Sequence, residues 1–210
     1  MDKYDPDNTV DFYVDEWGTW YDKAKETDSV LYQQNTLRDA LVASINLNIF
    51  HNYAERVKMT NIAQMVNVLQ AMILTDKERM VLTPTYHVFD MYVPFQGATR
   101  LDLEIKNQQQ YTHNKTSIPV LSASSAKSKD GKKWLALTNS HPHKSVTVEL
   151  NTKNKFKAAA GQVLTAKKMD AHNTFDHPQN IKPSAFSAKA KNKKLKIDLP
   201  AKSVMVIELK

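Results

Sequence analysis

The chain has 210 residues, enough for one large domain or two small ones, and its 41% hydrophobic and 24% charged residues are typical of a globular protein. It has no cysteine, which excludes a disulfide framework and a thiolate metal site. The acidic, polar start does not resemble a signal peptide, and no apolar run approaches the roughly 18 residues that span a bilayer, so we expect no membrane partner.

The net charge of +7 is unevenly divided along the sequence. Residues 1–97 hold 8 Lys/Arg and 14 Asp/Glu, whereas residues 98–210 hold 21 and 8, so the balance changes from −6 to +13. Such a break suggests two units with different surfaces. The lysines of the second unit lie in turn-like stretches without interleaved aromatic residues. We therefore favour a solvated lysine-rich surface over a nucleic-acid partner, with weak attraction to acidic polysaccharide as the lesser alternative.

The first half of the sequence begins with a strand pattern and continues with a helix pattern. β-branched and aromatic residues predict a strand at 9–15. Apolar side chains recur at three- and four-residue steps in 34–54, which predicts a long helix. Another short strand is predicted at 56–60.

A second helix is predicted near the end of this half. Residues 61–74 form a helical or loop segment without a clear period. Thr83 and Pro84 are a good helix start, since Thr can cap the helix and Pro suits its first position. This helix should stop before Pro94, because a residue that precedes proline disfavours the helical conformation.

After Gly97 the apolar pattern changes to a period of two, which is typical of strands. Asp130-Gly131 is a turn signal between two of the runs. Several short strands with turns between them predict a β-sandwich at 98–210, so the fold class is α/β at 1–97 followed by all-β. Strands are predicted at 99–105, 118–123, 133–138, 145–150, 162–166, 195–199 and 203–209.

Glu16 is the first candidate for chemistry, because it lies just beyond the C-terminal end of the first predicted strand. In a βα barrel, catalytic side chains occupy this position. Trp17, Trp20 and Tyr21 follow it, and aromatic faces suit the C–H faces of a sugar. Glycoside hydrolysis normally needs two carboxylates across the scissile bond. On residue types alone, a surface acid beside core tryptophans is the favoured interpretation.

Four motifs follow one another in the first half: Asp-Glu-Trp-Gly-Thr-Trp-Tyr at 15–21, and the runs at 33–43, 61–71 and 85–92. In this order they resemble the nucleophile strand, the next helix, the segment after the last barrel strand and the closing helix of retaining α-L-arabinofuranosidases of glycoside hydrolase family 51. The resemblance implies the C-terminal part of such an enzyme. Residues 1–97 would be the last two strands and helices of a (β/α)8 TIM barrel, and 98–210 a jelly-roll-like β-sandwich.

The resemblance also implies roles for single residues. Glu16 matches the catalytic nucleophile, which forms a covalent arabinosyl-enzyme intermediate. Trp20 matches a tryptophan that lines the arabinose pocket, and Gln64 matches a glutamine that hydrogen-bonds the sugar. Asp15 is either an acceptor that orients its neighbours or a buried hydrogen-bonded acid. The implied substrates are arabinose-containing glycans, and the implied parent enzyme is a homo-oligomer, often a hexamer.

We expect no metal and no cofactor. His141 and His143 have no carboxylate or third histidine nearby, so we interpret His141-Pro142-His143 as a turn. The sequence has 4 glycines, too few and too scattered to build a phosphate-binding loop.

The sequence departs from the family in its catalytic set. The Asn-Glu pair that supplies the acid/base in the family does not occur here, and only two of eight barrel strands are expected. We therefore expect a fragment of a glycoside hydrolase that releases terminal arabinofuranose, inactive alone. The alternative is a non-catalytic carbohydrate-binding or structural β-sandwich with a barrel relic. Nothing in the sequence indicates the compartment.

Overall fold

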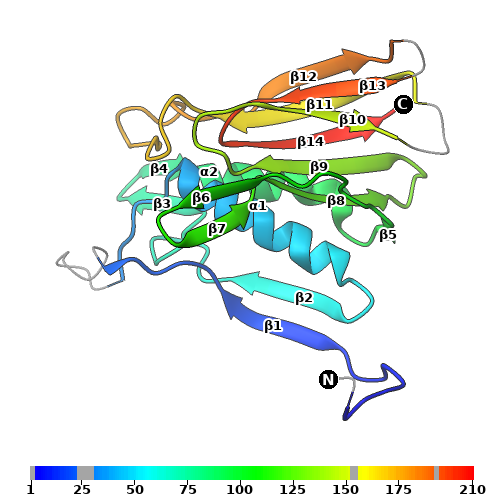
Figure 1. Ribbon diagram of the computed structural model, residues 1–210. Helices are drawn as coiled ribbons and strands as arrows, with labels where there is room; N and C mark the ends of the chain where they lie inside the picture. The colour runs from blue at the N-terminus through cyan, green and yellow to red at the C-terminus, as the bar shows by residue number, and fades with distance from the viewer. Residues whose placement is uncertain (1–2, 23–30, 152–155, 192–193) are drawn as a thin grey trace.

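The computed structural model describes residues 3–22, 31–151, 156–191 and 194–210 (Figure 1). Its elements are, in chain order, β1 (Phe12–Trp17), α1 (Leu37–Asn52), β2 (Val57–Ile62), β3 (Ile73–Asp76), β4 (Arg79–Leu82), α2 (Pro84–Tyr92), the 3-10 helix η2 (Val93–Phe95), β5 (Thr99–Leu101), β6 (Gln110–His113), β7 (Thr116–Pro119), β8 (Leu121–Lys127), β9 (Lys133–Asn139), β10 (Val146–Leu150), β11 (Ala158–Thr165), β12 (Ser184–Lys189), β13 (Leu195–Leu199) and β14 (Ser203–Leu209).

A six-stranded antiparallel sheet lies at the centre, in the order β12-β11-β14-β9-β8-β5. Successive residues of β14 alternate between its two faces. Val204 and Val206 belong to the core on the helix side, and Met205 and Ile207 belong to the core on the other side. Because both faces are covered, β14 is an almost continuous apolar run instead of an apolar-polar alternation.

The face away from the helices is covered by a second, two-stranded sheet. β10 and β13 pair antiparallel, and Leu195, Ile197 and Leu199 of β13 are buried against the larger sheet. Two sheets with a shared apolar core form a β-sandwich. The sandwich predicted for the second half of the sequence is therefore present.

The other face of the six-stranded sheet is covered by α1 and α2. Buried polar side chains link these helices. The Tyr92 hydroxyl lies 2.8 Å from Ser44 Oγ and donates to Asn48 Oδ1 at 2.9 Å. Ser44 also bonds Thr138 of β9, and Ser124 of β8 donates to Asn48 at 2.8 Å. The two units that the charge break separates therefore share a buried interface.

Among the helices that the structure describes, none has an apolar stretch of the length that would span a bilayer.

β1 and β2 lie on the far side of α1, as the lowest layer in Figure 1. They pair in parallel and are connected through α1, so the predicted strand–helix–strand order is confirmed. The ring of Trp17 packs against Phe50 of α1 at 5.4 Å and against Phe89 of α2 at 6.2 Å between centroids. Within the described residues, these two strands have no further sheet partner.

The predicted start of α2 is confirmed. Thr83 is the N-cap residue, and its Oγ1 accepts a hydrogen bond from the backbone N–H of Tyr86 at 3.4 Å. The helix ends at Tyr92, before Pro94, and one 3-10 turn follows. The predicted strand at 9–15 begins and ends too early, because β1 begins at Phe12 and continues to Trp17, so Glu16 lies within the strand and not just beyond it.

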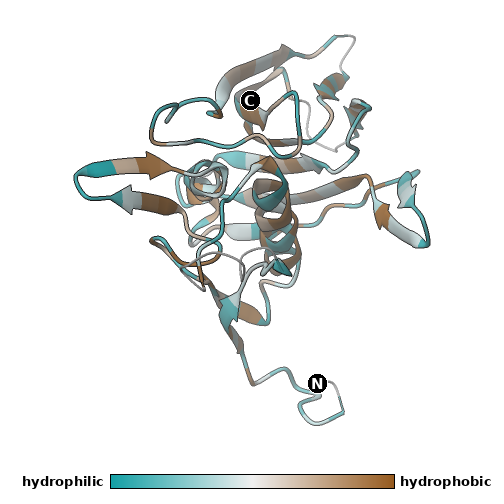
Figure 2. Cartoon of the chain, turned by 90° about the vertical axis from the view of Figure 1, so that its left-hand side faces the viewer, coloured by the Kyte–Doolittle hydropathy of each residue, from teal (hydrophilic) through white to brown (hydrophobic). Residues whose placement is uncertain are grey.

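Three features of the sheet structure escape the sequence patterns. The β3–β4 hairpin occupies part of the segment predicted as helix or loop, and its turn places Lys77, not Gly or Asn, at a φ of 55°. The β6–β7 hairpin is mostly exposed, so its strands show no apolar alternation. β12 consists largely of small residues. Figure 2 shows the two hairpins projecting on opposite sides of the body.

The predicted strand at 99–105 is wrong beyond Leu101, where β5 ends. Leu103 and Ile105 still reach the sandwich core without forming a strand.

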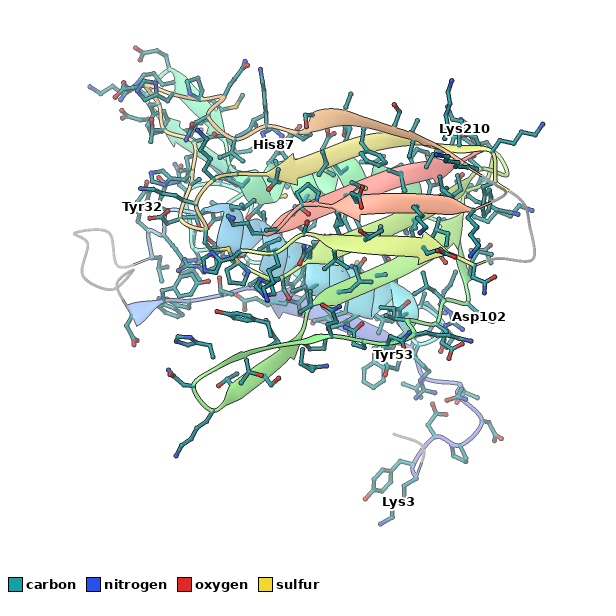
Figure 3. The ribbon with its side chains drawn as sticks, turned by 45° about the horizontal axis from the view of Figure 1, so that its top comes forward. Lys3, Tyr32, Tyr53, His87, Asp102 and Lys210 are labelled. Atoms are coloured by element: carbon teal, nitrogen blue, oxygen red, sulfur yellow. The ribbon has the colours of Figure 1, made fainter. Side chains whose placement is uncertain are left out.

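Figure 3 looks across the large sheet with α1 behind it, and shows Lys3 on an N-terminal segment that leads away from the sheet.

His51 of α1 provides a test of the helix–sheet interface. Its ring stacks on Phe95 at 4.7 Å, and its Nδ1 lies 3.2 Å from Ser124 Oγ. Burial lowers the pKa of His51 to about 4. In an unfolded chain, histidine titrates near 6.5. Between these pH values the unfolded chain binds a proton that the folded chain does not. The free energy of unfolding therefore keeps its full value above about pH 6.5 and falls as the pH drops from 6.5 toward 4.

We predict that the chain loses about 2 kcal/mol more stability between pH 7 and 4.5 than its His51→Gln variant does. Urea unfolding at both pH values measures the difference. His113→Gln is the control, because His113 is exposed and its replacement should leave the pH dependence of the parent unchanged. Equal losses in the parent and in His51→Gln would contradict the prediction.

Candidate functional site

The C-terminal ends of β1 and β2 form one edge of their sheet, because the two strands are parallel. Trp17 pairs with Ile62 there, and the backbone N–H of Ala63 donates to the Trp17 carbonyl at 2.9 Å. Glu16 is exposed near the end of β1, and Gln64 is exposed just after β2. The structure therefore brings the predicted nucleophile and the predicted sugar-binding glutamine to the same edge.

β1 is irregular where it carries Glu16. Val14 pairs with Thr60 and Trp17 with Ile62, so β1 contains one more residue than β2 over this stretch. A bulge of this kind redirects side chains and is frequent beside active sites. Trp17 is packed between the helices, whereas Glu16 is exposed to solvent.

The aromatic residues around Glu16 differ in their environment. Trp17 is partly buried and packs against the core, but Trp20 is 52% exposed. Asp15 is exposed as well, so a buried, hydrogen-bonded acid at this position would need cover from outside the described residues. An exposed tryptophan close in the chain to an exposed carboxylate is compatible with sugar binding.

The loop after β1, residues 18–21, is held by Gln33, from the segment that leads into α1, and by Arg38, from the first turn of α1. The backbone N–H of Tyr21 donates to Gln33 Oε1 at 3.1 Å, and Gln33 Nε2 donates to the Thr19 carbonyl at 3.2 Å. The Arg38 guanidinium lies 3.6 Å from the centroid of the Tyr21 ring, a cation–π contact. These contacts fix the backbone on both sides of Trp20.

A buried polar cluster behind this loop is not evident from the sequence. We call it the Gln70 cluster; its members are Thr19, Gln33, Asp39 and Gln70. Gln70 Nε2 donates to Thr19 Oγ1 at 2.5 Å and to Asp39 Oδ1 at 3.1 Å. Asp39 Oδ2 accepts from the backbone N–H of Thr36 at 2.7 Å, which forms the capping box of α1. The Thr-x-x-Asp spacing signals this cap, but no local pattern links Gln70 to it.

Gly18 packs directly on Gln70. A Cβ atom at position 18 would lie 2.7 Å from Gln70 Cγ and 3.3 Å from its Cβ. The φ of Gly18 is +155°, a conformation that other residues rarely adopt. Only glycine therefore allows the loop to approach the Gln70 side chain this closely.

His141 lies in a turn. Its Nδ1 accepts hydrogen bonds from the backbone N–H groups of His143 and Lys144, both at 3.1 Å. Across the residues that the structure describes, no three His, Asp or Glu side chains gather as they would around a metal ion.

The sequence matches the family model described as the alpha-L-arabinofuranosidase C-terminal domain over residues 15–203. The chain belongs to this family. The match begins at Asp15, so it includes the strand end with Glu16, the Gln70 cluster and nearly all of the sandwich.

Similar proteins support this assignment. An intracellular exo-alpha-L-arabinofuranosidase from Bacteroides ovatus is 45% identical over 212 residues, which cover 100% of this chain and 41% of that protein. The crystal structure of a family 51 (GH51) arabinofuranosidase from Xanthomonas axonopodis pv. citri superposes with a TM-score of 0.94 at 50% identity, covering 100% of this chain and 43% of the other. The chain thus spans less than half the length of these relatives.

A more distant structure, the arabinose complex of the Thermotoga maritima alpha-L-arabinofuranosidase, has a TM-score of 0.83 at 23% identity. It covers 100% of this chain and 45% of that protein, and shows a common fold. The predicted resemblance to the C-terminal part of family 51 arabinofuranosidases is confirmed.

We predict that Gly18→Ala destabilises the chain by at least about 1 kcal/mol more than Gly131→Ala does. Both glycines have positive φ angles, but a Cβ at Gly131 would meet nothing within 4 Å. The difference therefore reports the clash with Gln70 together with the strain of an alanine at a φ of +155°. Chemical denaturation of the two variants and the parent measures it, and equal losses would show that the loop moves away from Gln70 at little cost.

Proposed function

We propose that the chain is the C-terminal part of a retaining α-L-arabinofuranosidase that releases terminal arabinofuranose from arabinose-containing glycans. The observation that carries this proposal is the exposed Glu16 carboxylate at the C-terminal end of a parallel strand, beside the strand end that carries Gln64. Catalytic groups of βα barrels lie at this end of the strands. Relatives at 45% and 50% identity are named arabinofuranosidases.

In this proposal residues 1–97 are the last two strands and helices of a (β/α)8 barrel, and residues 98–210 are the sandwich domain. The parallel pairing of β1 and β2 supports it, and so does the position of α1 between these strands in the sequence. Phe12, Tyr13 and Met59 on these strands are 39%, 59% and 45% exposed. Six further strands would pair with the free sides of β1 and β2 and cover these side chains.

The chemistry needs a second carboxyl group. In a retaining mechanism, the Glu16 carboxylate attacks the anomeric carbon as the glycosidic bond breaks, and a carboxylic acid about 5–5.5 Å away protonates the leaving oxygen. The same group then removes a proton from the water that hydrolyses the arabinosyl ester. We expect this group to be the glutamate of an Asn-Glu pair on an earlier barrel strand. Trp20 and Gln64 would bind the sugar, and the parent would assemble as a homo-oligomer.

Replacement of Glu16 tests the nucleophile. In the full-length protein, Glu16→Ala should abolish hydrolysis of 4-nitrophenyl α-L-arabinofuranoside, because no covalent intermediate can form. Azide should restore turnover and give a product of inverted configuration, since it enters the space that the carboxylate leaves. Product configuration is measured by NMR. Full activity of Glu16→Ala without azide would disprove the assignment.

The second test concerns the 210-residue chain alone. It should release no 4-nitrophenol above the background of its Glu16→Gln variant, because the proposed pocket lacks most of its walls, which removes the orientation of the sugar, and the base that activates water is absent, a loss of about 10²–10⁴-fold in rate by itself. Turnover that disappears in Glu16→Gln would mean that the acid is within this chain or is supplied by another copy. If the full-length protein is also inactive but binds arabinan, the non-catalytic alternative holds.

A further inference from the structure

We infer that Gln70 is a positioning residue, which sets the place of Glu16 and Trp20 through the loop between them. The inference rests on the proposed function, since it assigns Gln70 a role in the same site. Gln70 is 0% exposed, so its side chain is not part of the solvent-exposed surface at the C-terminal ends of β1 and β2. Its effect on the reaction would therefore be transmitted by the residues that it holds.

Gln70 contacts all three segments that meet at this edge. Its side-chain amide donates to Thr19 in the loop after β1 and to Asp39 in the first turn of α1. Its backbone N–H donates at 3.1 Å to the carbonyl of Ala63, the residue before Gln64. A displacement of Gln70 would therefore change the spacing between the two strand ends.

The amide group suits this position because it has two N–H donors and its neighbours offer two acceptors. Both N–H groups donate hydrogen bonds, one to Thr19 Oγ1 and one to Asp39 Oδ1. Gln70 Oε1 has no hydrogen-bond partner among the described residues. The side chain thus acts through its two donated bonds, and a carboxyl group of the same shape could not make both.

The Thr19 hydroxyl is held by both Gln70 and Asp39. Its Oγ1 accepts from Gln70 and lies 3.3 Å from Asp39 Oδ1, to which it donates. Gln33 Nε2 holds the carbonyl of the same residue. Thr19 directly precedes Trp20 and follows Glu16 by three residues. A misplacement of about 1 Å at reacting groups can cost on the order of 10²-fold in rate.

The test is a pair of substitutions in the full-length protein that exchange donor and acceptor. Gln70→Glu puts two carboxyl groups side by side, which repel each other when charged. Asp39→Asn removes one acceptor. In the double variant the amide introduced at position 39 can donate to the new carboxylate, and its oxygen can still accept from Thr36. We expect kcat to fall about 10- to 100-fold in Gln70→Glu and to recover largely in the double variant.

Asn139→Asp is the matched control, because Asn139 is equally buried and bonds the Leu199 and Pro200 carbonyls within the sandwich. It should lower the melting temperature and leave kcat unchanged. A lower melting temperature of Gln70→Glu with unchanged kcat would overturn the inference, since Gln70 would then be structural only. Failure of the double variant to recover kcat would overturn it too.

Thr19→Val keeps the test decisive if Gln70→Glu does not fold. Valine has the shape of threonine without the hydroxyl, so kcat should fall because Glu16 is displaced, and KM should rise because Trp20 binds the sugar. An unchanged kcat would reject the positioning role. Glu16→Ala, measured in parallel, separates the two proposals: if it is inactive while Thr19→Val and Gln70→Glu retain kcat, only the role of Gln70 fails.

Discussion

The burial of α1 between two sheets is the constraint on which the rest of the structure depends. On one side it packs against β8, β9 and β14 of the six-stranded sheet, and on the other it reaches β2. Ser44 and Asn48 bond the sheet side, while Phe50 meets the ring of Trp17. A helix buried on both sides has little freedom to shift. The sandwich can therefore fix the place of β1, although none of the sandwich strands that the structure describes pairs with β1.

The elements that the sequence reveals are those whose local pattern agrees with their tertiary environment. The capping position of Thr83 and the proline after it depend on neighbouring residues alone, so the start of α2 is predictable. β14 is predictable because its burial on both faces demands an apolar run. The β3–β4 hairpin is not, since Lys77 takes the positive φ that turn rules reserve for Gly or Asn. Tertiary contacts decide such segments.

The candidate site also has one part that local sequence patterns predict and another part that they do not. The position of Glu16 follows from a strand pattern and a short motif, both of which are local. Gln70 cannot be found by such means, because its bonds reach Thr19 and Asp39 across 51 and 31 residues. Polar side chains carry no periodic signal, and a glutamine in a loop suggests a surface position. Only the assembled fold shows that this one is buried.

Asp39 explains why the loop and the helix end should form together. A carboxylate without partners is very costly to bury, and its burial requires hydrogen bonds to its oxygens. Asp39 is 0% exposed, and the Arg38 guanidinium lies 3.5 Å from its Oδ2. Its other partners come from separate segments: Thr36 from the cap of α1, Thr19 from the loop after β1 and Gln70 from the segment after β2. Opening the loop would remove the Thr19 bond and expose Gln70. The buried charge thus couples the order of the loop beside Glu16 to the end of the helix that the sandwich holds in place.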